Sequence, residues 1–173
     1  RLCSPSSKRL RRNILSIHHA DEAQSMTNFR IEHLPFDAGA VNVWSQTDER
    51  NNNWPVVYTL SAADRIYVGE THNVANRLYQ HMASVDRKNL KMVRIVFNEQ
   101  FNKSVCLDLE SQLIRYLHAD GNFQVLNRNY GITDADYYDR ARYREGFNVV
   151  FDQLLEEGVL TRSIPDIINS NLF

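Results

Sequence analysis

The stretch from Val56 to His81, VVYTLSAADRIYVGETHNVANRLYQH, decides the fold. Its segments 56–60 and 65–69 are rich in β-branched and aromatic residues, and they flank a polar tetrapeptide. Two such segments, joined by about three to five residues, predict a β-hairpin. Gly69 ends the second strand, where the backbone must turn or lie close to another group.

A helix is predicted directly after the hairpin. Thr71 and Asn73 are candidate N-caps, and apolar residues recur on one face of the segment that follows them. Arg77 and His81 are four residues apart, so their side chains point the same way on this helix. With one tyrosine on each strand, the sequence predicts a cluster of polar groups at one end of a small sheet.

The chain after this helix completes a mixed fold. Residues 90–98 predict a third strand, and residues 104–120 predict a longer helix that Gly121 ends. Glu110 lies at the border of the apolar stripe of that helix, where a carboxylate can meet a ligand. The order strand, strand, helix, strand, helix predicts an α+β fold with a small three-stranded antiparallel sheet flanked by helices.

The remaining segments read as extensions of this unit. Residues 1–27 are basic and lack periodicity, which fits a disordered arm, sequence added for expression or an organelle transit peptide. Residues 28–54 are an N-terminal extension with two short edge strands or extended arms, at 29–33 and 41–43. Residues 132–173 are a C-terminal helical extension, with a long helix over 132–158 and a short one from Ser163. The chain between these extensions, residues 55–131, is the predicted central domain.

The composition excludes several classes of protein. Hydrophobic residues make up 43% of the chain and charged residues 24%, as in ordinary soluble domains. No run approaches the roughly 18 apolar residues of a membrane span. Two cysteines and no Cys/His metal spacing predict neither a disulfide framework nor structural zinc, and favour a cytoplasmic protein. A net charge of −1 argues that any nucleic-acid binding comes from a local patch.

Residues 54–131 resemble the GIY-YIG nucleases. The first family motif, Gly-Ile-Tyr, aligns with VVY ending at Tyr58, and the second, Tyr-Ile-Gly, aligns with YVG from Tyr67 to Gly69. The first motif keeps only its tyrosine, because a valine stands where the family has glycine. The helical arginine, a histidine found in some branches, the metal-binding glutamate and the late asparagine of the family fall on Arg77, His81, Glu110 and Asn127.

The resemblance implies a metal-dependent endonuclease that hydrolyses DNA phosphodiester bonds. Glu110 would bind one Mg²⁺ or Mn²⁺ ion, since Mg²⁺ commonly takes one or two carboxylates and keeps several waters. Arg77 would clamp the phosphate with its planar guanidinium. Tyr58 would take a proton from water, with Tyr67 orienting water or phosphate and His81 as a substitute base. Asn127 would hold local backbone or phosphate in place.

Basic residues between Thr71 and Gly131 exceed acidic ones, which favours a surface for a nucleic-acid backbone. The residues predicted to bind substrate are Gly69, Arg77, Lys88, Lys91 and Arg128. Each residue taken alone fits a structural role: strand tyrosines usually pack, and a helical Arg and His four apart usually face solvent. Their joint occurrence in the family's order favours the site.

Three hypotheses about function remain open on the sequence alone. The first is the endonuclease, which resembles the module that precedes a Schlafen-like helicase region in some bacterial proteins. A helicase domain beyond Phe173 would then be a partner. The second is an inactive binding module that delivers such a helicase to branched or damaged nucleic acid. The third is a protein-interaction domain that uses the aromatic residues of 137–151.

Overall fold

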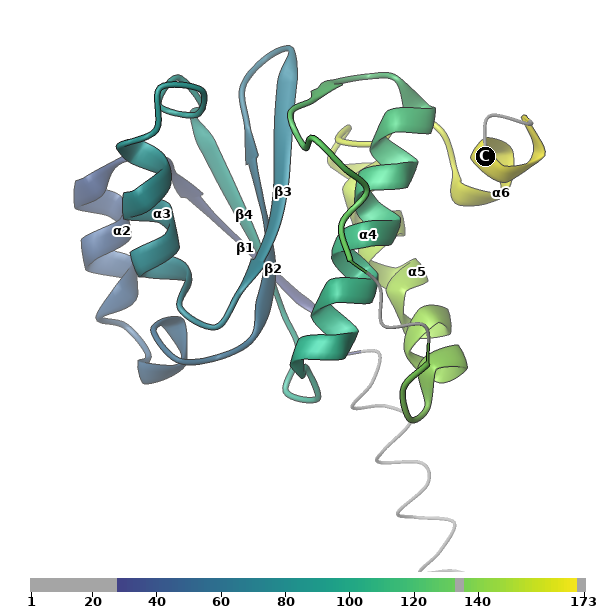
Figure 1. Cartoon of the computed structure of the whole chain (residues 1–173), viewed down its shortest axis with the longest axis horizontal. Coiled ribbons are helices and arrows are strands. Elements are labelled where there is room, and N and C mark those ends of the chain that lie inside the picture. The colour runs from purple at the N-terminus through teal and green to yellow at the C-terminus, as the bar shows by residue number, and fades with distance from the viewer. Residues whose placement is uncertain (1–27, 133–135, 171–173) are drawn as a thin grey trace, which may run out of the picture.

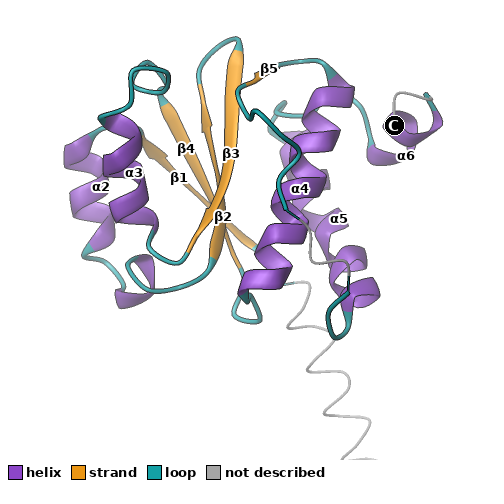
Figure 2. Ribbon diagram, in the orientation of Figure 1, coloured by secondary structure: helices purple, strands orange, loops and turns teal. Residues whose placement is uncertain are grey.

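The computed structural model describes residues 28–132 and 136–170. The predictions for residues 1–27, and for residues 133–135 of the long C-terminal helix, lie outside the described residues. The fold is a sheet with helices on both faces, as Figure 1 and Figure 2 show. Within the described part, no helix is long and apolar enough to cross a membrane.

The sheet has five strands in the order β1-β4-β2-β3-β5. Their bounds are β1 Arg30–Pro35, β2 Val56–Ser61, β3 Arg65–Thr71, β4 Met92–Phe97 and β5 Gln124–Val125. The predicted antiparallel sheet of β2, β3 and β4 is confirmed, and β1 adds an antiparallel edge strand to β4. The prediction of three strands was wrong in number. The fifth strand, β5, pairs with β3 in parallel and has only two residues, too few to show periodicity.

Helices cover the two faces unequally. Their bounds are α2 Ala38–Ser45, α3 Val74–Met82, α4 Lys103–Asp120, α5 Arg140–Glu156 and α6 Ile164–Asn169, with a short 3₁₀ turn at Glu49–Asn51. The α2 and α3 helices lie on one face, whereas α4 lies on the other with α5 packed behind it (Figure 1). Each face has its own apolar core, so the sheet separates two clusters of buried side chains.

Capping side chains explain where the helices begin. Asn73 accepts a hydrogen bond from Asn76 N at 2.9 Å, and Asn102 accepts one from Val105 N at 3.1 Å. Gly121 ends α4 in the left-handed conformation, with φ of 77°. These caps confirm the predicted start of α3 after Asn73, and the predicted bounds of α4 to within one residue.

Two predictions outside the central hairpin were wrong. Residues 41–43 belong to the α2 helix and not to an extended arm, because Asp37 caps that helix by accepting from Ala40 N at 2.9 Å. The long helix predicted over 132–158 begins only at Arg140. Asp139, with φ of 58°, has a left-handed backbone that a helix cannot continue through.

Candidate active site

The site is centred on the pairing of Tyr58 with Gly69, which lie opposite each other on β2 and β3. The Tyr58 ring crosses directly over Gly69. A Cβ atom at residue 69 would lie 2.4 Å from the Tyr58 hydroxyl oxygen and 2.6 Å from its ring carbon Cζ. Glycine is therefore required here by the close approach that the sequence predicted, and not by a turn.

The Tyr58 hydroxyl is buried and contacts His81 of α3. Its oxygen lies 2.7 Å from His81 Nε2, and both side chains are almost fully buried. Tyr67 completes the cluster, with its ring centre 5.0 Å from that of His81 and 6.3 Å from that of Tyr58. The structure thus brings together the two tyrosines and the histidine that the sequence singled out.

Arg77 lies one turn before His81 on α3 and is half-buried. Its Nη1 donates to Gln80 Oε1 at 2.8 Å. Burial raises the pKa of Tyr58 well above its usual value, and the Arg77 guanidinium only partly opposes that shift. Tyr58 is therefore a neutral phenol in the protein alone. Burial and the positive charges of Arg87 and Arg77 lower the pKa of His81 to about 4, so its imidazole is neutral at pH 7.

The outer edge of β3 supplies the second half of the site. The β5 strand pairs with β3 only as far as Ile66, and the Asn127 side chain then continues the pairing. Its Oδ1 accepts from Val68 N at 3.0 Å, and its Nδ2 donates to Val68 O at 2.8 Å. Asn127 therefore holds local backbone, one of the two roles considered for it.

Glu110 of α4 lies beside Glu70, the residue that follows Gly69 on β3. Burial and the negative charge of Glu70 raise the pKa of Glu110 to about 7. Lys103, a hydrogen bond from the Glu70 backbone and the charge of Arg77 act in the opposite direction. Since Arg77 influences both Glu110 and Tyr58, the sheet edge joins groups from its two faces.

Glu70 is the carboxylate that sequence reasoning missed. One of its oxygens, Oε1, pairs with Lys103 at the start of α4. The other, Oε2, is buried and has no hydrogen-bond partner among the described residues. A free buried carboxylate oxygen next to Glu110 fits a hard divalent cation, which prefers oxygen ligands. Strand alternation was the available signal, because Glu70 follows Gly69 and must face α4.

The predicted substrate-binding residues do not all lie together. Arg128 lines an open groove of about 600 Å³ with Arg65 and Arg87, beside the tyrosine cluster. Lys88 is exposed in the loop after α3. Lys91 is exposed next to Ser61, at the hairpin end of β2. In the described residues, no hydrogen bond or ion pair joins either lysine side chain to the site.

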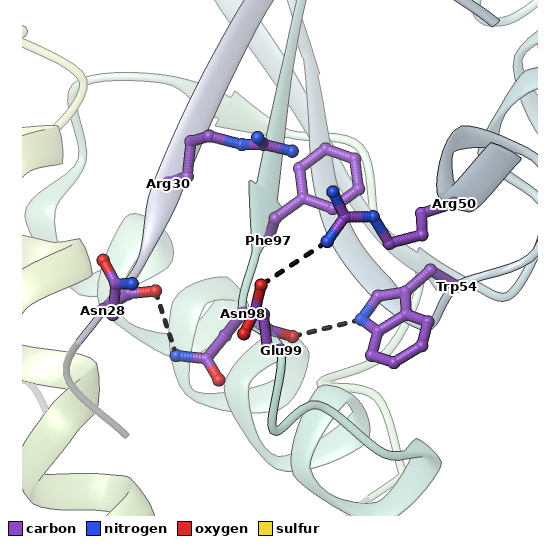
Figure 3. A pocket seen from close by; sticks show the side chains of 7 residues that line it. All are labelled: Asn28, Arg30, Arg50, Trp54, Phe97, Asn98 and Glu99. Carbon is purple, nitrogen blue, oxygen red and sulfur yellow. Dashed lines mark hydrogen bonds and ion pairs between the residues drawn. The ribbon is translucent and has the colours of Figure 1, made fainter. Parts of the chain in front are cut away.

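A separate small pocket lies at the far end of β4. It has a volume of about 140 Å³ and, as Figure 3 shows, contains two arginines and two aromatic rings. Both arginines are engaged: Arg50 pairs with Asp48 at 2.7 Å and reaches Glu99, and Arg30 pairs with Glu32 at 2.9 Å. Its charges are therefore already compensated, and it shares no residue with the tyrosine cluster. Its lining residues are Asn28, Arg30, Arg50, Trp54, Phe97, Asn98 and Glu99.

Comparison with families of known proteins gives a match over the central part of the chain. Residues 55–122 match the family model of the GIY-YIG catalytic domain. The match contains both tyrosines, Gly69, Arg77, His81 and Glu110. No curated protein and no solved structure gave a significant match to the chain. Because the family consists of endonucleases, the domain implies nuclease-type activity and a nucleic-acid substrate.

Proposed function

We propose that residues 55–131 form a metal-dependent endonuclease domain that hydrolyses phosphodiester bonds in DNA. The observation that carries this proposal lies on β3, where Tyr58 crosses over Gly69 to reach His81 on one face, and the next residue, Glu70, lies beside Glu110 on the other.

The proposed division of labour follows from each side chain's surroundings. Arg77 is half-buried and positively charged, which suits it to hold the scissile phosphate. Tyr58 would exchange a proton with the attacking water, and a hydrogen bond from Arg77 partly offsets the burial that disfavours its phenolate. Tyr67 would orient water or phosphate, and Asn127 would hold the backbone of β3 at Val68.

We propose that Glu110 and Glu70 together would hold one Mg²⁺ or Mn²⁺ ion. The unpartnered Oε2 of Glu70 and the raised pKa of Glu110 both mark a place where Lys103 only partly offsets two negative charges. Within the described ranges, no group of three or more His, Cys, Asp or Glu side chains is placed to hold a metal. Two carboxylates suffice for Mg²⁺, which keeps several waters. When bound, such a cation would offset the charge on the phosphoryl oxygens.

The groove lined by Arg65, Arg87 and Arg128 supports a path for the nucleic-acid backbone beyond the scissile phosphate. Phosphate contacts position a nucleic acid and carry no sequence information. The proposal therefore includes no base specificity. Attachment to a helicase, and a cytoplasmic location, stay predictions from the sequence.

A plasmid-nicking assay with Mg²⁺ or Mn²⁺, run beside EDTA, tests the proposal. Glu110→Gln removes the charge that would hold the cation while keeping the shape of the side chain. We expect nicking to be lost, while DNA binding without metal, measured by gel shift, survives or improves. Arg77→Ala should weaken both, because a guanidinium contacts phosphate in the ground state and the transition state alike.

The matched control is Glu156→Gln, which removes the same charge from an exposed position on α5. It should nick as the wild type does. Full nicking by folded Glu110→Gln would show that this carboxylate is not a metal ligand. Absence of nicking by the wild type, with intact DNA binding, would favour the rival hypothesis of a binding module. Thermal melts with and without Mn²⁺ give a second readout, since a ligand bound only by the folded state raises Tm.

A further inference from the structure

Arg87, in the loop after α3, makes two contacts with the buried cluster. Its Nη1 lies 3.0 Å from His81 Nδ1, and its guanidinium carbon lies 4.0 Å from the centre of the Tyr67 ring. The second contact is a cation–π interaction, in which the positive group lies over the ring face. In the sequence Arg87 is only one of several basic residues between Thr71 and Gly131, but in the structure it lies behind the pair formed by His81 and Tyr58.

The contact with Arg87 determines which nitrogen of His81 carries the hydrogen. A guanidinium has N–H donors and no acceptor, so His81 Nδ1 must accept. A neutral imidazole carries one hydrogen, which therefore lies on Nε2. The Nε2–H group points at the Tyr58 oxygen, 2.7 Å away, and donates to it.

The opposite arrangement is incompatible with the geometry. If His81 accepted the Tyr58 proton at Nε2, its hydrogen would lie on Nδ1 and would face an Arg87 N–H at 3.0 Å. Two donors facing each other in a buried site leave both unsatisfied, which costs about 1–3 kcal/mol. His81 is also almost fully buried, so water cannot relieve this conflict.

We propose that Arg87 is a positioning residue that holds His81 in the Nε2–H tautomer, so that His81 is a hydrogen-bond donor to Tyr58 and not its base. The catalytic consequence rests on the proposed role of Tyr58. A donor at the phenol oxygen stabilises the phenolate, the form that takes a proton from water. The arginine thereby acts on Tyr58 through His81, and it also covers the ring of Tyr67.

The groups that face His81 come from each element around it. Tyr58 lies on β2, Tyr67 on β3, Arg77 on the same helix and Arg87 in the following loop. In the described residues no carboxylate pairs with this imidazole. Protonating His81 would therefore place a third positive charge among two guanidiniums, which the neutral donor avoids.

The test combines two measurements. The first is a ¹⁵N NMR spectrum of histidine-labelled protein between pH 6 and pH 8, and the second is the rate of plasmid nicking. The chain has six histidines, and His81→Gln identifies the His81 signals by their loss. We expect the wild type to show a protonated Nε2 and an unprotonated Nδ1. Arg87→Met, which keeps an aliphatic chain over Tyr67 but removes the donors, should give a mixture of tautomers. Its nicking rate should fall roughly ten- to a hundredfold.

Two further variants separate positioning from a general loss of charge. Arg87→Lys keeps a donor and should restore both the Nε2–H signal and much of the nicking. Arg142→Met removes one positive charge from α5, on the other side of the sheet, and should change neither (Figure 1). A hydrogen on Nδ1 in the wild type would overturn the proposal, and so would wild-type nicking by Arg87→Met. An Nε2–H signal in a wild type that nicks no DNA would support the tautomer and refute the proposed function.

Discussion

Two buried polar networks, one on each face of the sheet, differ in how their charges are balanced. On the α4 face, Asp108 is fully buried and accepts from Arg144 at 2.7 and 2.8 Å and from Tyr137 at 3.0 Å. On the α3 face, Tyr58 contacts His81, which contacts Arg87. Each network contains a tyrosine and an arginine, but only the first has a carboxylate between its cations.

The pKa values record this difference. Burial raises the pKa of Asp108, but hydrogen bonds from Arg144 and Tyr137 outweigh it and hold that pKa below its usual value. On the α3 face, burial and the two neighbouring arginines lower the pKa of His81 to about 4, which leaves its imidazole neutral. A balanced network stabilises the fold in which it lies. An unbalanced network costs stability. We infer that the charges of the network on the α3 face are arranged for a ligand.

Breaking the balanced network should have the largest effect on stability. Asp108→Ala removes the carboxylate that joins α4 to α5 and leaves Arg144 and Tyr137 without their partner. We expect the free energy of unfolding to fall by about 3 kcal/mol, as when one partner of a buried pair is lost. Urea denaturation measures this. Nicking per folded molecule should persist, and a loss of nicking without a loss of stability would contradict the comparison.

A methyl group at Gly69 should break the unbalanced network. Gly69→Ala drives Cβ into the Tyr58 ring, so that the strand or the ring must move. We expect a loss of about 1–3 kcal/mol in stability, typical of overpacking, together with loss of nicking. Gly158→Ala is the control, since its φ of 72° strains an alanine by about 1 kcal/mol but its surroundings are open. That variant should nick normally once folded.

The charge of Glu110 should cost stability only at high pH. The pKa of Glu110, about 7, exceeds its unfolded value of 4.5. The stability of the fold with a neutral Glu110 is therefore fully present below pH 4.5, and part of it is lost as the pH rises through 7 and the carboxyl group ionises. In EDTA, Glu110→Gln should therefore raise the unfolding free energy at pH 8 by about 1–2 kcal/mol, after a discount for solvent exposure, and change little at pH 5. Equal Tm differences at both pH values would contradict this assignment.

Local signals in the sequence were enough to predict the central fold. Segments rich in β-branched and aromatic residues predicted β2 and β3, residues 90–98 predicted β4, and the side chain of Asn73 predicted where α3 begins. The errors fell where local signals were weak. The left-handed Asp139 delays α5, and β5 exists because β3 offers it an edge and not because of its own two residues.

The site was predictable only in part, because spacing cannot show which groups face one another. Strand and helix positions, together with the family resemblance, pointed to Tyr58, Tyr67, Arg77, His81 and Glu110. They did not reveal that Glu70 lies beside Glu110, or that Arg87 reaches His81 from a loop. Loop residues have no periodicity to place them, so the positions of Lys88 and Lys91 could not be predicted either.

The most direct test compares the nicking rates of Tyr58→Phe and Tyr137→Phe, each corrected for the fraction folded. Both variants remove one buried or half-buried hydroxyl that contacts a polar side chain, and both should lose about 1–2 kcal/mol of stability. Tyr58→Phe should lose about a hundredfold or more in rate, as expected when a proton-transfer group is removed, while Tyr137→Phe keeps the wild-type rate. A wild-type rate for folded Tyr58→Phe would contradict the account.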